Sequence, residues 1–216
     1  MGWTLAPGTG FCETAEELIF LDLSRDKYFA LRGRDRAAFA RLRAGQANDS
    51  DTMARLVATG LLQRTDKPTS IASTVIDVPS RDLAAVPEEG FSLGMVISSM
   101  LAVRWARSAM RSERIGRTLA DRRRHAAAIA REPAGPAIEA LAARYAANRW
   151  INPEPQRCLI DALALDHILV AKGLVPTLVF GVRMAPFRAH CWLQTPSAIL
   201  TGTAAEARNF TPILVV

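Results

Sequence analysis

The sequence predicts an α+β protein that consists of a small strand-and-helix module, a linker, and a second domain in which helices precede an antiparallel sheet. Half of the 216 residues are hydrophobic, which is enough to build cores in a chain of this length. Short apolar runs near both ends of the chain are typical of strands, whereas the middle shows helical spacing. A proline-rich polar stretch separates the two parts. We therefore expect boundaries at residues 1–65, 66–90 and 91–216.

The first module is predicted to contain a hairpin followed by two helices. These two strands and two helices are expected at residues 17–23, 27–31, 34–45 and 49–62. Gly45 ends the first helix, and Asp49, Ser50 or Asp51 is available to cap the second. Within the linker, the segment "STVIDV" (73–78) has the composition of one further strand.

The second domain is predicted to place its helices first and its sheet last. Helical spacing covers residues 92–112, 117–131 and 136–149. Pro153 and Pro155 then lead into a further helix, because proline does not fit inside one. Cys158 therefore lies in or near the first turn of this helix, and Gly173 ends it. Alternating apolar residues predict strands at residues 174–183, 187–194 and 198–202.

Charge and cysteine usage exclude several classes of function. The net charge of +6 comes largely from arginines between Arg104 and Arg131, a segment with no zinc knuckle or recognised nucleic-acid motif. We expect a solvated helix face there, or a dock for an acidic protein or peptide, and no nucleic acid. Three unevenly spaced cysteines match neither a disulfide framework nor a zinc site, which favours a reducing, cytoplasmic compartment and no metal.

No targeting or membrane-spanning segment is predicted. The first residues lack the basic start and apolar run of a signal peptide. The least charged long stretch, residues 90–106, is shorter than the roughly 20 apolar residues that a membrane span needs. We expect this stretch to form a core helix.

Cys158 is a candidate nucleophile because of its position at the start of a helix. The partial positive charge and free N–H groups of a helix amino terminus favour a thiolate over a thiol. The alternative is a structural role, since free cysteines are commonly buried as small hydrophobic residues. A cysteine nucleophile also needs a base, usually a histidine that a third group orients.

His190 is the preferred base among three histidines. His167 follows Cys158 on the same predicted helix and points to the opposite side at about 100° per residue. His125 lies in a charged surface pattern. His190 instead lies on a predicted strand with Arg188, Trp192 and Gln194 on its face, while Cys191 faces the other way. A polar side chain beside an aromatic one is typical of a half-open cleft.

These residues lead to a family resemblance. The stretch "RCLIDALALDHILVAKGLVPTLVFGVR", followed by "FRAHCWLQ" and "RNFTPIL", resembles the transglutaminase-like B proteins that mature lasso peptides, over roughly residues 151–216. The resemblance implies a papain- or transglutaminase-like domain that acts as a cysteine leader peptidase without a cofactor. It implies that Cys158 is the nucleophile and that His190 is the base.

The amino-terminal module resembles the PqqD-like leader-recognition domain, a winged-helix-type fold, in "ETAEELIFLDLSRDKYFAL" and "GLLQR". The resemblance implies that a leader peptide adds a strand to the edge of the sheet and packs on a helix. The implied leader-binding residues are Lys27, Tyr28, Phe29, Ala30 and Leu31 on the strand, and Met53, Leu56 and Val57 on the helix.

The third catalytic group departs from the family pattern. Family members usually carry an aspartate in a motif like "LND" before "FTPIL", whereas this chain has "LTG", with Thr201 and Gly202 in place of Asn and Asp. Three explanations stay open: a Cys–His dyad, a substitute carboxylate or amide, or weakened catalysis. The candidate substitutes are Glu206, Asn209 and Asp161. For an oxyanion hole, the Cys158 N–H would be joined by the side chain of Asn152 or Gln156.

The resemblance also implies partners. They are a lasso precursor peptide, bound through its leader, and a separate ATP-dependent, asparagine synthetase-like cyclase that joins the freed amine to a side-chain carboxylate. The chain itself has no GxxxxGK[ST] phosphate loop. The arginines between Arg104 and Arg131 either dock the cyclase or form a solvated face. A leader-binding chaperone without cleavage and a transglutaminase-like acyl transferase are the alternative functions.

Overall fold

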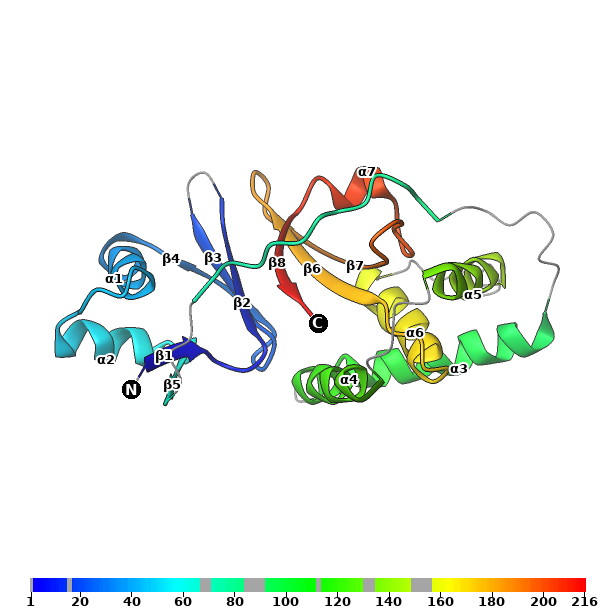
Figure 1. Cartoon of the computed structure of the whole chain (residues 1–216), viewed down its shortest axis with the longest axis horizontal. Helices are drawn as coiled ribbons and strands as arrows, with labels where there is room; N and C mark the ends of the chain where they lie inside the picture. The colour runs from blue at the N-terminus through cyan, green and yellow to red at the C-terminus, as the bar shows by residue number, and fades with distance from the viewer. Residues whose placement is uncertain are drawn as a thin grey trace.

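Two small antiparallel sheets meet at the centre of the molecule, and helices lie outside them on both sides (Figure 1). The fold is therefore α+β, as expected, with a small sheet first, helices in the middle and an antiparallel sheet last. The computed structural model describes residues 2–14, 17–66, 71–83, 92–111, 114–129, 135–148 and 157–216.

The amino-terminal part contains a three-stranded sheet, a two-stranded ribbon and two helices. In chain order these are β1 (Gly2–Leu5), β2 (Thr9–Glu13), β3 (Leu18–Asp22), β4 (Lys27–Leu31), α1 (Gly33–Arg43), α2 (Ser50–Ala58) and β5 (Leu62–Thr65). The sheet has the order β2-β3-β4, and the ribbon pairs β1 with β5. The predicted hairpin is confirmed, and the Asp49 carboxylate caps α2 by accepting a hydrogen bond from the Thr52 N–H at 2.8 Å.

The second predicted helix is too long at its carboxyl end. It ends at Ala58, four residues before the predicted limit of Leu62. Gly60 takes a left-handed conformation with φ of +76°, which ends the helix and turns the chain into β5. The sequence prediction also missed β1 and β5, which pair with each other from opposite ends of the module.

The carboxyl-terminal part has the predicted order of helices followed by a sheet. Its elements are α3 (Leu93–Ala109), α4 (Ile115–Ile129), α5 (Gly135–Asn148), α6 (Cys158–Val170), β6 (Thr177–Arg183), β7 (Arg188–Gln194), α7 (Ala204–Ala207) and β8 (Thr211–Val215). The sheet has the order β7-β6-β8 and is antiparallel throughout. Cys158 is the first residue of α6, and Gly173 follows its end with φ of +72°.

Two strand predictions are wrong. Residues 198–202 form a loop in which Ile199 makes only single bridges, to Asp82 and Gln194. The Thr201 hydroxyl accepts the Leu193 N–H at 3.0 Å, so a side chain takes the place of a backbone partner and the ladder stops. The third strand of the sheet is β8 instead. Residues 73–78 form no strand, although Ile76 packs against the outer face of the sheet.

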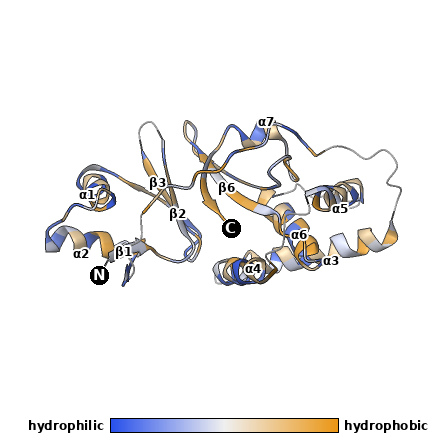
Figure 2. Cartoon of the chain, viewed as in Figure 1, coloured by the Kyte–Doolittle hydropathy of each residue, from blue (hydrophilic) through white to orange (hydrophobic). Residues whose placement is uncertain are grey.

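Helix α6 lies at the centre of the main hydrophobic core. Eight of its side chains are buried, and α3, α5 and β7 pack around it. Figure 2 shows the strongly apolar colouring of α6 and β6, which is typical of elements covered on several sides. The expectation of a core helix near residues 90–106 is met on one side of α3. Four apolar residues on its other side are exposed: Leu93, Ile97, Met100 and Leu101.

The amino-terminal sheet contributes to two cores. One of its faces packs on Phe39 of α1, whose ring centroid lies 5.3 Å from that of Phe11 and 5.0 Å from that of Phe20. The other face belongs to the main core through Ile19 and Leu21, together with residues of α3, α6 and β6. The two parts of the chain are therefore joined by packed side chains as well as by the intervening segment.

The contact between the sheets is closest where β2 meets β8. Gly10 lies so near Ile213 that an added Cβ would overlap the Ile213 carbonyl oxygen. Residues 71–83 run across both sheets (Figure 1), and the Thr74 hydroxyl donates to the same carbonyl at 2.9 Å. This packing brings the β3–β4 hairpin towards the start of α6.

Candidate active site

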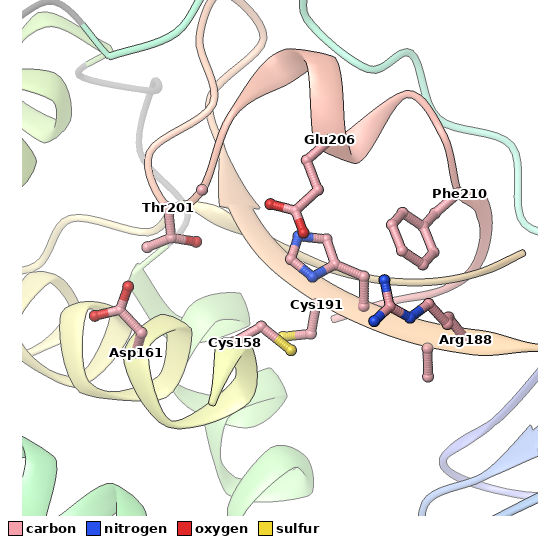
Figure 3. Close-up of a pocket in the computed structure, with 10 residues that line it drawn as sticks. Cys158, Asp161, Arg188, Cys191, Thr201, Glu206 and Phe210 are labelled. Carbon is pink, nitrogen blue, oxygen red and sulfur yellow. The ribbon is translucent and has the colours of Figure 1, made fainter. Parts of the chain in front are cut away.

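A cavity of about 480 Å³ lies between the start of α6, strand β7 and helix α7. Its walls come from four segments of the carboxyl-terminal part (Figure 3). They are Cys158 and Asp161 of α6, Arg188, Ala189, His190 and Cys191 of β7, Thr201 and Gly202 of the following loop, and Glu206 and Phe210 at and beyond α7. The structure thus brings Cys158 and His190 into one cavity.

Cys158 differs from the other two cysteines in its exposure. Cys12 and Cys191 are buried, whereas Cys158 is half-buried at the amino terminus of a thirteen-residue helix. Burial raises the pKa of Cys12 to about 11 and raises that of Cys191 well above its usual value. Those two thiols therefore stay protonated near neutral pH. Cys158 has both the access and the helix position that nucleophilic chemistry requires.

His190 lies on β7, and its ring packs against two aromatic rings. Only 9% of its surface is exposed, and its ring lies 5.7 Å from that of Trp192 and 5.0 Å from that of Phe210. Burial lowers the pKa of His190, and the negative charge of Glu206 partly opposes this effect. The imidazole is therefore neutral near pH 7, which is the form that can accept a proton.

Glu206 and Gly202 lie on the Nε2 side of His190. Nε2 is buried and has no hydrogen-bond partner in the described part of the chain. A Cβ added at Gly202 would lie 3.6 Å from Nε2 and 3.7 Å from Oε2 of Glu206. Glu206 extends from α7 into the cavity (Figure 3), and the Thr203 hydroxyl accepts the Glu206 N–H at 3.1 Å. Because Gly202 has no side chain, a space remains beside Nε2 of His190, and Glu206 borders this space.

The other candidate third groups have different surroundings. Asp161 lines the cavity one turn after Cys158, and its carboxylate accepts a hydrogen bond from the Tyr145 hydroxyl at 3.0 Å. The Asn209 amide donates to the Ala205 carbonyl at 2.9 Å and does not line the cavity. Of the three candidates, only Glu206 is both in the cavity and close to the free nitrogen of His190.

The remaining histidines lie outside the cavity. His167 stacks on Trp105 with ring centroids 4.1 Å apart, and His125 is exposed on α4. The predicted oxyanion-hole residues Asn152 and Gln156 lie outside the described residues. Within the described residues no group of three or more His, Cys, Asp or Glu side chains is arranged to hold a metal ion.

The predicted leader-binding residues fall into two separate places. β4 is an edge strand, with Lys27 and Ala30 exposed, Tyr28 and Phe29 half-buried and Leu31 buried. On α2, Met53 lines a groove of about 590 Å³ that no β4 residue borders. Leu56 is 1% exposed in the core below, and Val57 is 36% exposed.

Several residues of the cavity wall were not among the residues predicted for the site, including Arg188, Ala189, Cys191 and Phe210. Phe210 also packs on His190. Arg188 had a usable signal, because it lies two residues before His190 and therefore on the same face of a strand. Phe210 had none, because it enters the cavity from the segment between α7 and β8.

One comparison with known proteins finds a family match, and the match covers the part of the chain that contains this cavity. A family model described as the transglutaminase-like superfamily matches residues 97–215, which is more than half of the chain and includes Cys158 and His190. No curated protein and no solved structure matches the chain. The part of the chain that the structure describes contains no helix long and apolar enough to cross a membrane.

Proposed function

The chain belongs to the transglutaminase-like superfamily, and we propose that it is a cysteine peptidase that removes the leader from a ribosomal precursor peptide. The observation that carries this proposal is the cavity shared by Cys158, His190 and Glu206. An accessible thiol at a helix start, a neutral buried imidazole and a nearby carboxylate are the groups that acyl transfer through a thioester requires.

In the first half of the proposed reaction, His190 takes the proton of the Cys158 thiol. The thiolate then attacks the last carbonyl carbon of the leader, so that a C–S bond forms and the carbonyl oxygen becomes negative. The peptide C–N bond breaks as this intermediate collapses. The leaving nitrogen takes the proton from His190, and the core peptide departs with a free amine.

In the second half, water hydrolyses the thioester. His190 accepts a proton from the water as its oxygen attacks the acyl carbon. The C–S bond breaks, the leader leaves as a carboxylic acid, and Cys158 regains its proton. Glu206 orients the imidazole through its Nε2 side and stabilises the imidazolium that forms in each half.

The amino-terminal module supplies leader recognition in this proposal. β4 is an edge strand, so its outer backbone groups can pair with an added strand. The resemblance to lasso peptide B proteins suggests that the precursor is a lasso peptide and that a separate ATP-dependent cyclase uses the freed amine.

The proposal is tested with a synthetic lasso precursor peptide that contains both a leader and a core. Mass spectrometry would follow its incubation with the wild-type protein, with Cys158→Ala and with Cys12→Ala, each with and without the cyclase. We expect an intact leader and a free core from the wild type and from Cys12→Ala, and neither product from Cys158→Ala. Cys12 is the matched control because it is a buried cysteine outside the cavity.

Other outcomes would replace the proposal. Equal leader release by Cys158→Ala would exclude a cysteine mechanism. Leader binding without cleavage under every condition would identify a leader-binding chaperone. A product in which the leader acyl group is joined to an added amine, in place of the free acid, would identify an acyl transferase.

A further inference from the structure

We propose that the amino-terminal sheet completes the active site by forming one wall of a small apolar subsite beside Cys158. This inference rests on the proposed function. A second cavity, of about 130 Å³, adjoins the larger one. Its apolar wall comes from both parts of the chain: Leu21, Leu23 and Tyr28 from the β3–β4 hairpin, and Ile115, Leu159 and Phe180 from the helices and sheet that follow.

The small cavity opens onto the reacting residues. Cys158, Ala189, His190 and Cys191 line both cavities. A side chain that fills the small cavity must therefore belong to a residue next to, or one position from, the bond that Cys158 attacks. The subsite consequently acts on the choice of cleavage site, in addition to any recognition farther along the leader.

The chemistry of the two cavities differs. The larger one presents the charged side chains of Asp161, Arg188 and Glu206. The smaller one is bordered by seven apolar or aromatic side chains, Ala189 included, and Asp26 is its only acidic neighbour among the described residues. Apolar walls favour the binding of an apolar side chain, because binding removes both apolar surfaces from water. The small cavity therefore selects an apolar side chain.

The direction of strand addition assigns this subsite to the leader side of the bond. The sheet β2-β3-β4 is antiparallel throughout, so a leader strand that continues the pattern on β4 runs from Leu31 towards Lys27. Its carboxyl end then emerges beside Asp26 and Tyr28, both of which border the small cavity. The last leader residues therefore reach Cys158 from this side, and the subsite takes the side chain of one of them.

Tyr28 sets the size of the subsite. Its ring meets Phe187 of the β6–β7 turn edge to face, with centroids 5.4 Å apart and an interplanar angle of 68°. This contact holds the ring between the two parts of the chain. A smaller residue at position 28 would enlarge the cavity, and a larger one would fill it.

The test uses short substrates that contain no leader. Acetylated dipeptide p-nitrophenyl esters carry Gly, Val, Leu or Phe at either of the two positions, with Gly at the other. Release of p-nitrophenolate, corrected for the rate of Cys158→Ala, reports acylation of Cys158. For the wild type we expect Val or Leu at one position to raise kcat/KM about tenfold or more over Gly.

Variants at position 28 then test the wall itself. Tyr28→Ala is expected to raise the Phe-to-Leu ratio of kcat/KM about tenfold or more, and Tyr28→Trp to favour Gly. The matched control is Leu5→Ala, because Leu5 is a half-buried residue of the same module that packs on its other core. Thermal unfolding establishes that each variant is folded. If Tyr28→Ala does not fold, Tyr28→Trp alone decides.

The outcomes separate this inference from the proposed function. If the wild type and Cys158→Ala release p-nitrophenolate at the same rate, no acyl-enzyme forms, and both ideas fail. If the wild type is acylated but reacts equally with Gly, Val and Leu, the subsite is overturned while the cysteine mechanism stands. The same holds if folded Tyr28 variants keep the wild-type preference.

Discussion

At the scale of single residues, the carboxylate near His190 comes from Glu206 of α7 and not from position 202, where the resemblance seen in the sequence implies an aspartate. Gly202 occupies the place where an aspartate is expected, and its missing side chain leaves space beside Nε2. Glu206 borders this space from α7. The sequence motifs pointed to Cys158 and His190, and the structure brings these two residues into one cavity. The motifs were not sufficient to choose among the candidates for the third group. That choice depends on the left-handed conformation of Gly202 and on the position of the one-turn helix α7, which carries Glu206.

Removing the charge of Glu206 should weaken catalysis and change its pH dependence. We expect Glu206→Gln to lower kcat/KM roughly 10- to 100-fold, because the variant loses part of the rate enhancement that general acid–base catalysis supplies. The carboxylate raises the pKa of His190 against the effect of burial, so its loss lowers that pKa further. Because the base works in its neutral form, the acidic limb of the kcat/KM profile should move to lower pH. A limb that stays in place would show that Glu206 does not act through His190.

The same geometry predicts a rescue. In the Glu206→Gln background, Gly202→Asp should restore kcat/KM at least tenfold, because a Cβ at position 202 lies 3.6 Å from Nε2 of His190. Gly202 has φ of +77°, so the aspartate should cost about 1–2 kcal/mol of stability. Asp tolerates this conformation better than most residues. Gly202→Ala, which has the backbone cost without the carboxylate, should not restore activity.

At the scale of elements, the position of α6 depends on a buried ion pair with α4. Arg122 donates from Nε and from one Nη to the two carboxylate oxygens of Asp166, at 2.8 and 2.7 Å, and also to the Pro176 carbonyl at 2.6 Å. Both side chains are about 5% exposed or less. The sequence suggested only a solvated face or a dock for this arginine-rich segment, since charge in a sequence does not reveal burial.

Breaking this pair should destabilise the whole protein. Arg122→Ala leaves Asp166 as a buried charge without its partner and should lower the free energy of unfolding by about 3–5 kcal/mol. Urea denaturation followed by circular dichroism measures the change. Arg124→Ala is the matched control, because Arg124 pairs with Asp121 on the same helix but is 81% exposed. Its effect should stay within about 0.5 kcal/mol. A small effect of Arg122→Ala would mean that water reaches Asp166.

Local patterns predicted most elements and failed where pairing is distant. The hairpin of β3 and β4 and the helix that begins at Cys158 were found because alternation, prolines and caps lie within the segment itself. β1 and β5 were missed because each is short and, within the part of the chain that the structure describes, pairs only with the other one, about sixty residues away along the chain. Residues 198–202 were assigned to a strand because they alternate, but the Thr201 hydroxyl ends the pairing there.

At the scale of the whole molecule, the two predicted parts share one core. The sequence suggested two units and a linker, because composition changes sharply after residue 65. The structure places Leu21 and Leu23 of the first part in the core that surrounds α6. It also places Ser24 against the start of α4, 3.4 Å from a Cβ added at Gly116. Contacts between sheets leave no periodic signal in a sequence, so the shared core could not be predicted.

The closest point of this interface offers a direct test of whether the parts act together. Gly10→Ala adds a methyl group where β2 meets the Ile213 carbonyl of β8, and backbone cannot move aside as a flexible side chain does. We expect a loss of about 1–3 kcal/mol of stability, the usual cost of overpacking, measured by thermal unfolding. Because the same interface positions Tyr28 beside Cys158, acylation by the short leaderless esters should also fall. Gly94→Ala is the control: no atom of the described residues lies within 4 Å of its added Cβ on α3, so a gain of about 0.5–1 kcal/mol is expected. If Gly10→Ala lowers stability but the folded protein keeps full activity on the esters, the amino-terminal sheet is a support for the enzyme rather than a wall of its active site.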